Sequence, residues 1–185
     1  MARPRVRHTG GMTPWTAPPV VRAPSPRLGS ERETLQGWLE VQRQTLRHKC
    51  SGLTHEQLAT RSVAPSRLSL LGLVRHMAEV EAWWFRSNMR GEAAHGFFGP
   101  EDNLEGDFDD LDSMPAEDVF ALYAEHCRLA DDAVAHLPLE ATFRSIGRGT
   151  ELDLRWIYVH MIEEYARHNG HADLLRECLD GVTGD

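Results

Sequence analysis

The chain has 185 residues, of which 41% are hydrophobic and 8% aromatic, a composition typical of one globular domain with a core. Its formal net charge of −8 argues against nucleic-acid binding by the chain as a whole. The longest apolar run, residues 68–74, is too short to span a bilayer, so no membrane partner is expected.

Residues 1–29 differ from the rest because they combine five arginines with six prolines and contain no acidic residue. This arm also lacks the apolar segment of an export signal. We therefore expect a basic, Pro-rich extension that stays outside the core, with residues 30–185 as the folded domain. Contact between the arm and nucleic acid is the alternative that its charge leaves open.

The three cysteines, Cys50, Cys127 and Cys178, are odd in number and far apart, and none of them forms a Cys-x-x-Cys pair. A disulfide framework would require paired cysteines in an oxidising compartment. The pattern therefore predicts free thiols in a reducing compartment, here the cytoplasm.

Two capping boxes mark the first helices. Ser30 and Glu33 have the spacing of such a box, so a long helix is expected to begin after Ser30 and to end before Gly52. Thr54 and Gln57 repeat the spacing and predict a second, short helix.

A second long helix is predicted over residues 69–90, with Gly91 as its stop. His76 lies at the edge of its apolar stripe, so its side chain is expected to point inward or nearly so. Glu79 and Glu81 fall on other faces of the helical wheel.

Residues 91–114 read as a long loop, because seven acids and no basic residue occur within 101–112. Their spacing does not match an EF-hand, so we expect a solvent-exposed acidic loop, with a weak cation site as the alternative. A third long helix follows over residues 115–136, and an irregular connection over 138–150.

The last long helix, predicted over residues 152–177, carries polar side chains beside its apolar face. At about 100° per residue, His168 lies near the centre of that face and Glu164 lies beside it. The two are four residues apart, so their side chains are neighbours. His160 and His171 fall nearer the rim. A carboxylate and an imidazole that face a core either satisfy each other or share a metal.

Long helical patterns with irregular joins, and no strand-like alternation, predict an all-α fold built as a four-helix bundle. The joins are long, so the pattern does not fix the order in which the helices pack.

His76, from one helix, and the pair Glu164 and His168, from another, would supply two nitrogens and one oxygen. This set suits a divalent metal such as Zn²⁺, and three protein ligands leave one coordination place free, as in catalytic zinc sites. A hydrogen-bonded core histidine beside an internal Glu164–His168 ion pair is the alternative that spacing leaves open. Neither the di-iron pattern of ferritin-like bundles nor a His-Glu-x-x-His motif is present in the sequence.

Two motifs resemble the DinB-like superfamily, and more narrowly an actinobacterial branch of unknown function with the motif Arg-His-Asn-Gly-His-Ala-Asp. The resemblance extends over about residues 30–180 and excludes the basic arm. The motifs are Glu164-x-x-x-His168-Asn-Gly-His171-Ala-Asp and Leu73-Val-Arg-His76-Met.

This resemblance implies a DinB-like four-helix bundle, often a homodimer, in which three histidines hold a metal. Glu164 stands where the superfamily has the first histidine of a His-x-x-x-His pair. The same His/Glu/His set is found in mycothiol-dependent maleylpyruvate isomerase, a zinc enzyme of the superfamily. The resemblance therefore implies His76, Glu164 and His168 as ligands of a divalent metal, expected to be zinc.

The implied function is a metal-dependent enzyme that uses a low-molecular-weight thiol, mycothiol, as cosubstrate for S-transfer, isomerisation or detoxification of a small molecule. His160, His171 and Arg167 are candidates for orienting the ligands or contacting the substrate. The alternatives are a hydrolase that uses metal-activated water and a non-enzymatic, stress-related metal-binding dimer or binding module.

Overall fold

The structure is a computed structural model that describes residues 14–94, 96–98 and 106–183. It is mostly helical, with one small sheet. The long helices are α1 (Glu31–Cys50), α3 (Leu70–Glu81), α4 (Ala116–Val134) and α5 (Leu154–Asp180). The shorter elements are α2 (His55–Ala59), the π-helical segment η1 (Ala82–Asn88), the 3-10 turn η2 (Leu111–Ser113), and the strands β1 (Thr142–Arg144) and β2 (Glu151–Asp153).

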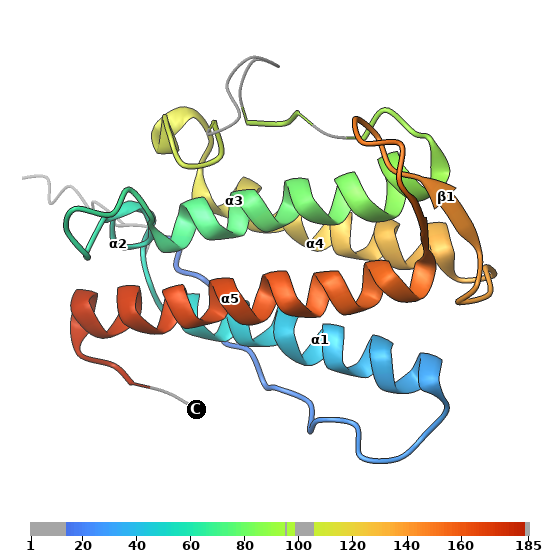
Figure 1. Cartoon of the computed structure of the whole chain (residues 1–185). Coiled ribbons are helices and arrows are strands. Elements are labelled where there is room, and N and C mark those ends of the chain that lie inside the picture. The colour runs from blue at the N-terminus through green and yellow to red at the C-terminus, as the bar shows by residue number, and fades with distance from the viewer. Residues whose placement is uncertain (1–13, 95, 99–105, 184–185) are drawn as a thin grey trace, which may run out of the picture.

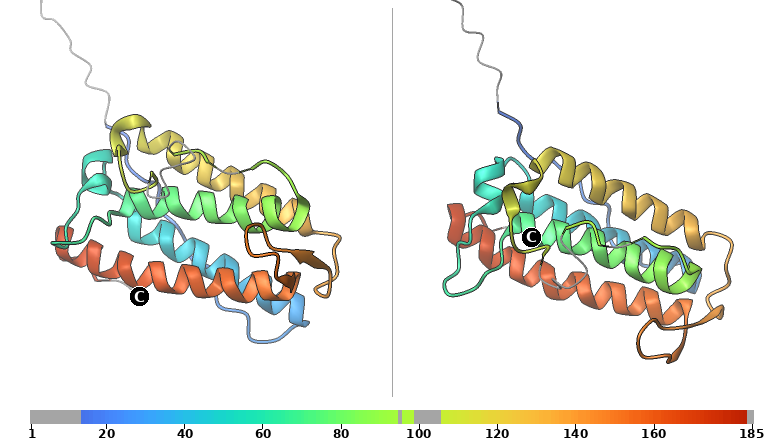
Figure 2. Two further views of the ribbon diagram at one scale, coloured as in Figure 1. Left: turned by 45° about the horizontal axis from the view of Figure 1, so that its top comes forward. Right: turned by 90° about the horizontal axis from the view of Figure 1, so that it is seen from above.

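The long helices lie side by side as two pairs, α1 with α5 and α3 with α4, and α3 also packs against α5 (Figures 1 and 2). Figure 1 shows that α3 and α4 run in one direction and that α1 and α5 run in the other. The long connection between α3 and α4 makes the parallel pair possible, because it returns the chain to the end at which α3 begins. This arrangement places α3 and α5, which carry the predicted ligands, next to each other.

Both predicted capping boxes are confirmed. The Ser30 hydroxyl accepts a hydrogen bond from the Glu33 backbone N–H, and the Glu33 carboxylate accepts one from the Ser30 N–H at 2.8 Å. Thr54 and Gln57 make the same reciprocal bonds at the start of α2. Each box satisfies backbone donors that have no partner within their own helix.

The helix predicted over residues 69–90 does not remain an α-helix throughout. It changes at Ala82 to the wider η1, in which the Met89 N–H reaches the carbonyl of Trp84, five residues earlier. Short π-helical segments of this kind interrupt α-helices and shift the side chains that follow. The sequence pattern gave no sign of this change.

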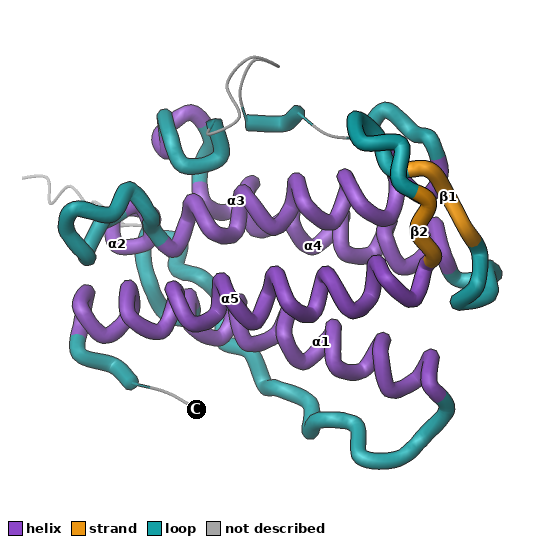
Figure 3. Tube along the Cα trace, in the orientation of Figure 1, coloured by secondary structure: helices purple, strands orange, loops and turns teal. Residues whose placement is uncertain are grey.

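The all-α prediction is wrong in one respect, because β1 and β2 form an antiparallel hairpin at one end of the helices (Figure 3). Each strand has three residues, too few to show an alternating pattern in the sequence. β2 leads directly into α5, where Asp153 accepts a hydrogen bond from the Trp156 N–H at 2.8 Å. This cap starts the helix at Leu154 rather than at residue 152.

The expectation that residues 1–29 stay outside the core is wrong at Ala17. Ala17 is 1% exposed, and its N–H donates to the Leu53 carbonyl at 2.9 Å, while its own carbonyl accepts from the Gly52 N–H. Trp15 packs edge-on against Phe120. Residues 1–13 lie outside the described residues, and the domain boundary near residue 30 stays a prediction.

A buried ion pair joins α1 to α3. Arg43 donates from Nε and Nη2 to the two oxygens of Glu81 at 2.7 and 2.8 Å, and the Glu81 side chain is fully buried. The prediction that Glu81 lies off the core-facing side of its helix is therefore wrong. A carboxylate is stable inside a protein only when it is paired and hydrogen-bonded, and Arg43 supplies that partner.

The network around this pair extends to α4 and α5. The Tyr165 hydroxyl donates to Glu81 at 2.8 Å. Since that hydroxyl has one proton, the Tyr123 hydroxyl is the donor in the 3.0 Å bond between the two tyrosines. Asp131 on α4 accepts from Nη1 of Arg43 with both oxygens. Each long helix thus contributes a side chain to one buried polar network.

Within the described residues, no helix is both long and apolar enough to cross a membrane. The three cysteines are free thiols, and burial raises the pKa of Cys50 to about 12.

Candidate metal centre

The three predicted ligands meet in the structure. His76 comes from α3, and Glu164 and His168 come from adjacent turns of α5. One ligand atom from each side chain can be chosen so that all three lie within 4.8 Å of one another. The side chains are half-buried, with exposed fractions of 24%, 26% and 12% respectively. We call these three residues the triad.

The internal ion pair that spacing left open is weak in the structure. Nε2 of His168 lies 3.5 Å from Oε2 of Glu164, which is long for a hydrogen bond. Nε2 of His160 lies 3.6 Å from the other oxygen. No lysine or arginine in the described part of the chain pairs with Glu164. Among the described residues, the side chains that pair with its negative charge are therefore imidazoles.

Asp107 is a functional candidate that the sequence analysis missed. Its Oδ2 lies 2.7 Å from Nδ1 of His76, so Nδ1 carries the proton of this bond and Nε2 is left to face the triad. Arg75 holds the loop in place by donating to the carbonyls of Gly106 and Asp110, each at 3.0 Å. The prediction of a solvent-exposed acidic loop is therefore wrong at Asp107, while residues 101–105 lie outside the described residues.

A close approach between α3 and this loop also depends on Gly72. The ring of Phe108 packs against His76, with 5.3 Å between ring centroids. A Cβ atom at position 72 would lie 2.8 Å from the Phe108 ring, closer than carbon atoms can approach. Gly72 therefore lets Phe108, and with it the neighbouring Asp107, approach His76. The run of acids without a basic residue was the only sequence signal, and it does not say which acid faces inward.

The chemistry of the triad fits a divalent metal. Burial, together with the nearby charges of His76 and His171, lowers the pKa of His168 to about 4, so its imidazole is neutral near pH 7. A histidine binds a metal through a neutral imidazole nitrogen, and His168 meets that requirement near pH 7. Two ligands of one zinc ion are at most about 4.2 Å apart, so the triad would need to close slightly on binding.

The histidines predicted to support the triad lie beside it. Nδ1 of His171 is 3.4 Å from Nδ1 of His168, and His160 lies next to Glu164. The third such candidate, Arg167, is exposed and pairs with Glu163 instead.

An aromatic group extends the site along α5. Trp156, His160, Glu164 and His168 follow one another at four-residue spacing, so they form one row on the helix surface. His160 stacks on Trp156 at a centroid distance of 4.7 Å and an interplanar angle of 19°. Trp84, from η1, lies 5.1 Å from Trp156 and 4.9 Å from His160.

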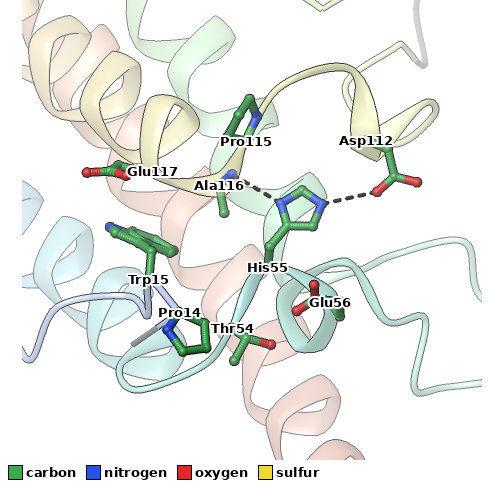
Figure 4. Close-up of a pocket in the computed structure, with 9 residues that line it drawn as sticks. All are labelled: Pro14, Trp15, Thr54, His55, Glu56, Asp112, Pro115, Ala116 and Glu117. Atoms are coloured by element: carbon green, nitrogen blue, oxygen red, sulfur yellow. Dashed lines mark hydrogen bonds and ion pairs between the residues drawn. The ribbon is translucent and has the colours of Figure 1, made fainter. Parts of the chain in front are cut away.

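A hollow of about 400 Å³ lies at the start of α4, and no residue of the triad lines it (Figure 4). His55 bridges one side of it, since Nδ1 accepts from the Ala116 N–H and Nε2 donates to Asp112, both at 3.1 Å. His55 thus caps α4, whose own N-cap residue, Pro115, has no side-chain hydrogen bond. This structural role explains the cluster without a reaction.

The sequence of the chain matches the model of one protein family. Residues 34–181 match the family model described as mycothiol-S-transferase (MST). That range covers most of the chain and includes all three triad residues. Searches of curated proteins and of solved structures gave no match.

Proposed function

We propose that this chain, which belongs to the mycothiol S-transferase family of the DinB-like superfamily, transfers the sulfur of mycothiol to a small electrophile at the triad. The superfamily resemblance seen in the sequence is confirmed by this membership. The observation that carries the proposal is the meeting of His76, Glu164 and His168 within 4.8 Å on a partly open surface. The absence of a cationic partner for Glu164 among the described residues supports it.

The triad has the donor set of a catalytic zinc site, with three protein ligands and a place for one more. A divalent ion held by these residues would lower the pKa of a thiol presented to it and so make that thiol a nucleophile at neutral pH. Zinc is the ion that this donor set suits best.

The residues around the triad have separate tasks in this proposal. Asp107 accepts the Nδ1 proton of His76 at 2.7 Å and so fixes the ring with Nε2 toward the site. His160, with Nε2 at 3.6 Å from Glu164, is placed to accept the proton that a thiol releases. The ring of Phe108 packs against the His76 ring, with 5.3 Å between their centroids, and so helps to hold the imidazole in place.

We further infer that α1, α3, α4 and α5 constitute the four-helix bundle of the superfamily. The family match begins after the basic arm, which supports the domain boundary near residue 30. The homodimer and the cytoplasmic location that were expected from the sequence stay predictions.

The proposal is tested by assaying the purified full chain with an electrophile, with and without mycothiol and with and without zinc. We expect turnover that requires both. Turnover with zinc but without any thiol would point instead to a hydrolase. Zinc that raises the melting temperature while no thiol supports turnover would point to a binding module and would contradict the proposal.

A further inference from the structure

A small hollow of about 300 Å³ lies where the hairpin meets the start of α5. Its lining combines an indole ring with two carboxylates and a hydroxyl. The residues are Thr142, Glu151, Leu152, Asp153 and Trp156.

The walls of the hollow are held in place by hydrogen bonds. Oδ1 of Asn88, in η1, accepts from the Ile146 N–H at 2.8 Å and so ties the hairpin loop to the helices. Within the loop, the Ser145 N–H donates to the Thr150 carbonyl at 2.8 Å. Thr142 pairs with Asp153 across the two strands, which places their side chains on the same face of the hairpin. A ligand would therefore meet a site that is already formed.

The position of Trp156 is also fixed, although 38% of it is exposed. One face of its ring stacks on His160, and Trp84 approaches it from η1. Contacts with these two rings hold the exposed indole in place and leave a rigid aromatic surface at the edge of the hollow. Such a surface binds a flat or ring-shaped group with little loss of side-chain entropy.

The lining indicates which ligands fit. Asp153 already accepts from the Trp156 N–H with Oδ1 and from Nη1 of Arg155, at 3.3 Å, with Oδ2. The carboxylate of Glu151 repels anions and would lose hydration without compensation beside a purely apolar ligand. A ring that carries hydroxyl groups satisfies both parts of the site, because its C–H face packs on the indole and its hydroxyls donate to the carboxylates. The hollow is therefore suited to a neutral or amine-bearing polyol ring.

Trp156 of the hollow and two residues of the triad, Glu164 and His168, lie on the same row of α5. Trp156 precedes Glu164 by eight residues, which is about 12 Å along a helix axis, and His160 lies between them. Mycothiol joins a cysteine thiol to a pseudodisaccharide of glucosamine and inositol. A thiol of that length can reach both places at once.

We propose that the hollow beside Trp156 binds the pseudodisaccharide of mycothiol while the sulfur lies at the triad. This inference rests on the proposed function. The hollow is then the part of the site that selects mycothiol among thiols.

The test compares mycothiol with N-acetylcysteine, which carries the thiol but no sugar ring. In W156A, the ratio of kcat/KM for mycothiol to that for N-acetylcysteine should fall about tenfold, within the range that stacking on an aromatic side chain gives for a base. The ratio is insensitive to partial unfolding and to any disturbance of His160, since both affect the two thiols alike. W156F, which keeps an aromatic surface, should restore part of the ratio.

Trp38 on α1 provides the matched control, because it is 39% exposed and does not line the hollow. W38A should keep the wild-type ratio. An unchanged ratio in W156A, or an equal fall in W38A, would overturn the inference.

A binding measurement separates this inference from the proposed reaction. The pseudodisaccharide without its cysteine should bind the wild-type chain in calorimetry and should bind W156A about tenfold more weakly, whether or not turnover is found. If no thiol supports turnover but this binding depends on Trp156, the proposed reaction is wrong, and the inference that the hollow binds the pseudodisaccharide is supported. If the wild-type chain does not bind the pseudodisaccharide, the hollow is not its site.

Discussion

Glu81 and Glu164 are two carboxylates at the core of the molecule that lie in opposite environments. Glu81 is fully buried, and Arg43 and Tyr165 satisfy its oxygens at 2.7 to 2.8 Å. Glu164 precedes Tyr165 by one residue but is 26% exposed, and the side chains that pair with it in the described part of the chain are imidazoles at 3.5 and 3.6 Å.

The difference shows how adjacent residues of α5 can belong to two sites, since Tyr165 bonds to the buried Glu81 network and Glu164 belongs to the candidate metal centre. A carboxylate that a guanidinium holds in two hydrogen bonds has little capacity left for another cation. A carboxylate among imidazoles at 3.5 and 3.6 Å keeps that capacity, and the imidazole nitrogens can share the cation with it. We therefore expect substitutions at Glu81 to affect stability and substitutions at Glu164 to affect metal binding.

The largest effect is expected from E81A. The substitution leaves Arg43 as a buried charge whose remaining partners, Asp131 and the more distant Glu40, are both paired through Nη1. Breaking a buried pair in this way costs about 3–5 kcal/mol. Urea unfolding of the two metal-free variants E81A and E164A measures the contrast. E164A should lose less than about 1 kcal/mol, because its ion pairs are long and partly exposed. Equal losses would show that the two carboxylates do not differ as described.

Metal affinity should fall most in H168A. This change removes a ligand, and its effect should exceed the roughly 10–100-fold loss that follows removal of a supporting residue. E164Q should weaken binding because it removes the negative charge, while E164H should retain the metal because it rebuilds the three-histidine set of the superfamily. Metal content and zinc competition measure all three variants. If E164H loses metal as completely as H168A, Glu164 does not occupy the position of the superfamily histidine.

A smaller loss is expected from D107N. The amide removes the charge that holds Nδ1 of His76, and metal affinity should fall about 10–100-fold. D110N is the matched control, because Asp110 lies on the same loop with an exposed side chain and contributes its carbonyl to Arg75. Zinc titration of both variants should show the loss only in D107N. A comparable loss in D110N would mean that loop charge in general, rather than the Asp107–His76 contact, matters.

The last prediction concerns the pH dependence of the free energy of unfolding. In the metal-free chain the pKa of His168 is lowered from 6.5 to about 4. The unfolded chain therefore binds the extra proton first as pH falls, so stability is complete above pH 6.5 and is lost as pH decreases toward 4. One such group gives a slope of at most about 1.4 kcal/mol per pH unit. Unfolding midpoints between pH 4 and 7 should show a shallower slope in H168Q, and an identical slope in both proteins would remove His168 as the cause.

Much of the fold and the candidate site was predictable because it depends on local spacing. The capping boxes at Ser30 and Thr54 fixed two helix starts, and the four-residue spacing of Glu164 and His168 placed both on one face of α5. His76 required only the further assumption that its helix packs against α5.

The features that were missed depend on contacts between distant segments. Glu81 is buried because Arg43, 38 residues away, meets it, and Asp107 turns inward because Arg75 and Gly72 hold its loop. The strands of the hairpin have three residues each, too few for the two-residue alternation of a strand to be recognised in the sequence. The apolar pattern of one helix does not show which residue of a distant segment will contact it.

The most direct test of the account is a zinc titration of the metal-free full chain, with mycothiol conjugation of an electrophile followed at each step. The account predicts that turnover rises with zinc and reaches a plateau at one ion per triad. It also predicts that H168A neither binds the zinc tightly nor turns over. Full turnover in the metal-free chain, or zinc binding that is unchanged in H168A, would contradict the claim that His76, Glu164 and His168 form a catalytic metal centre.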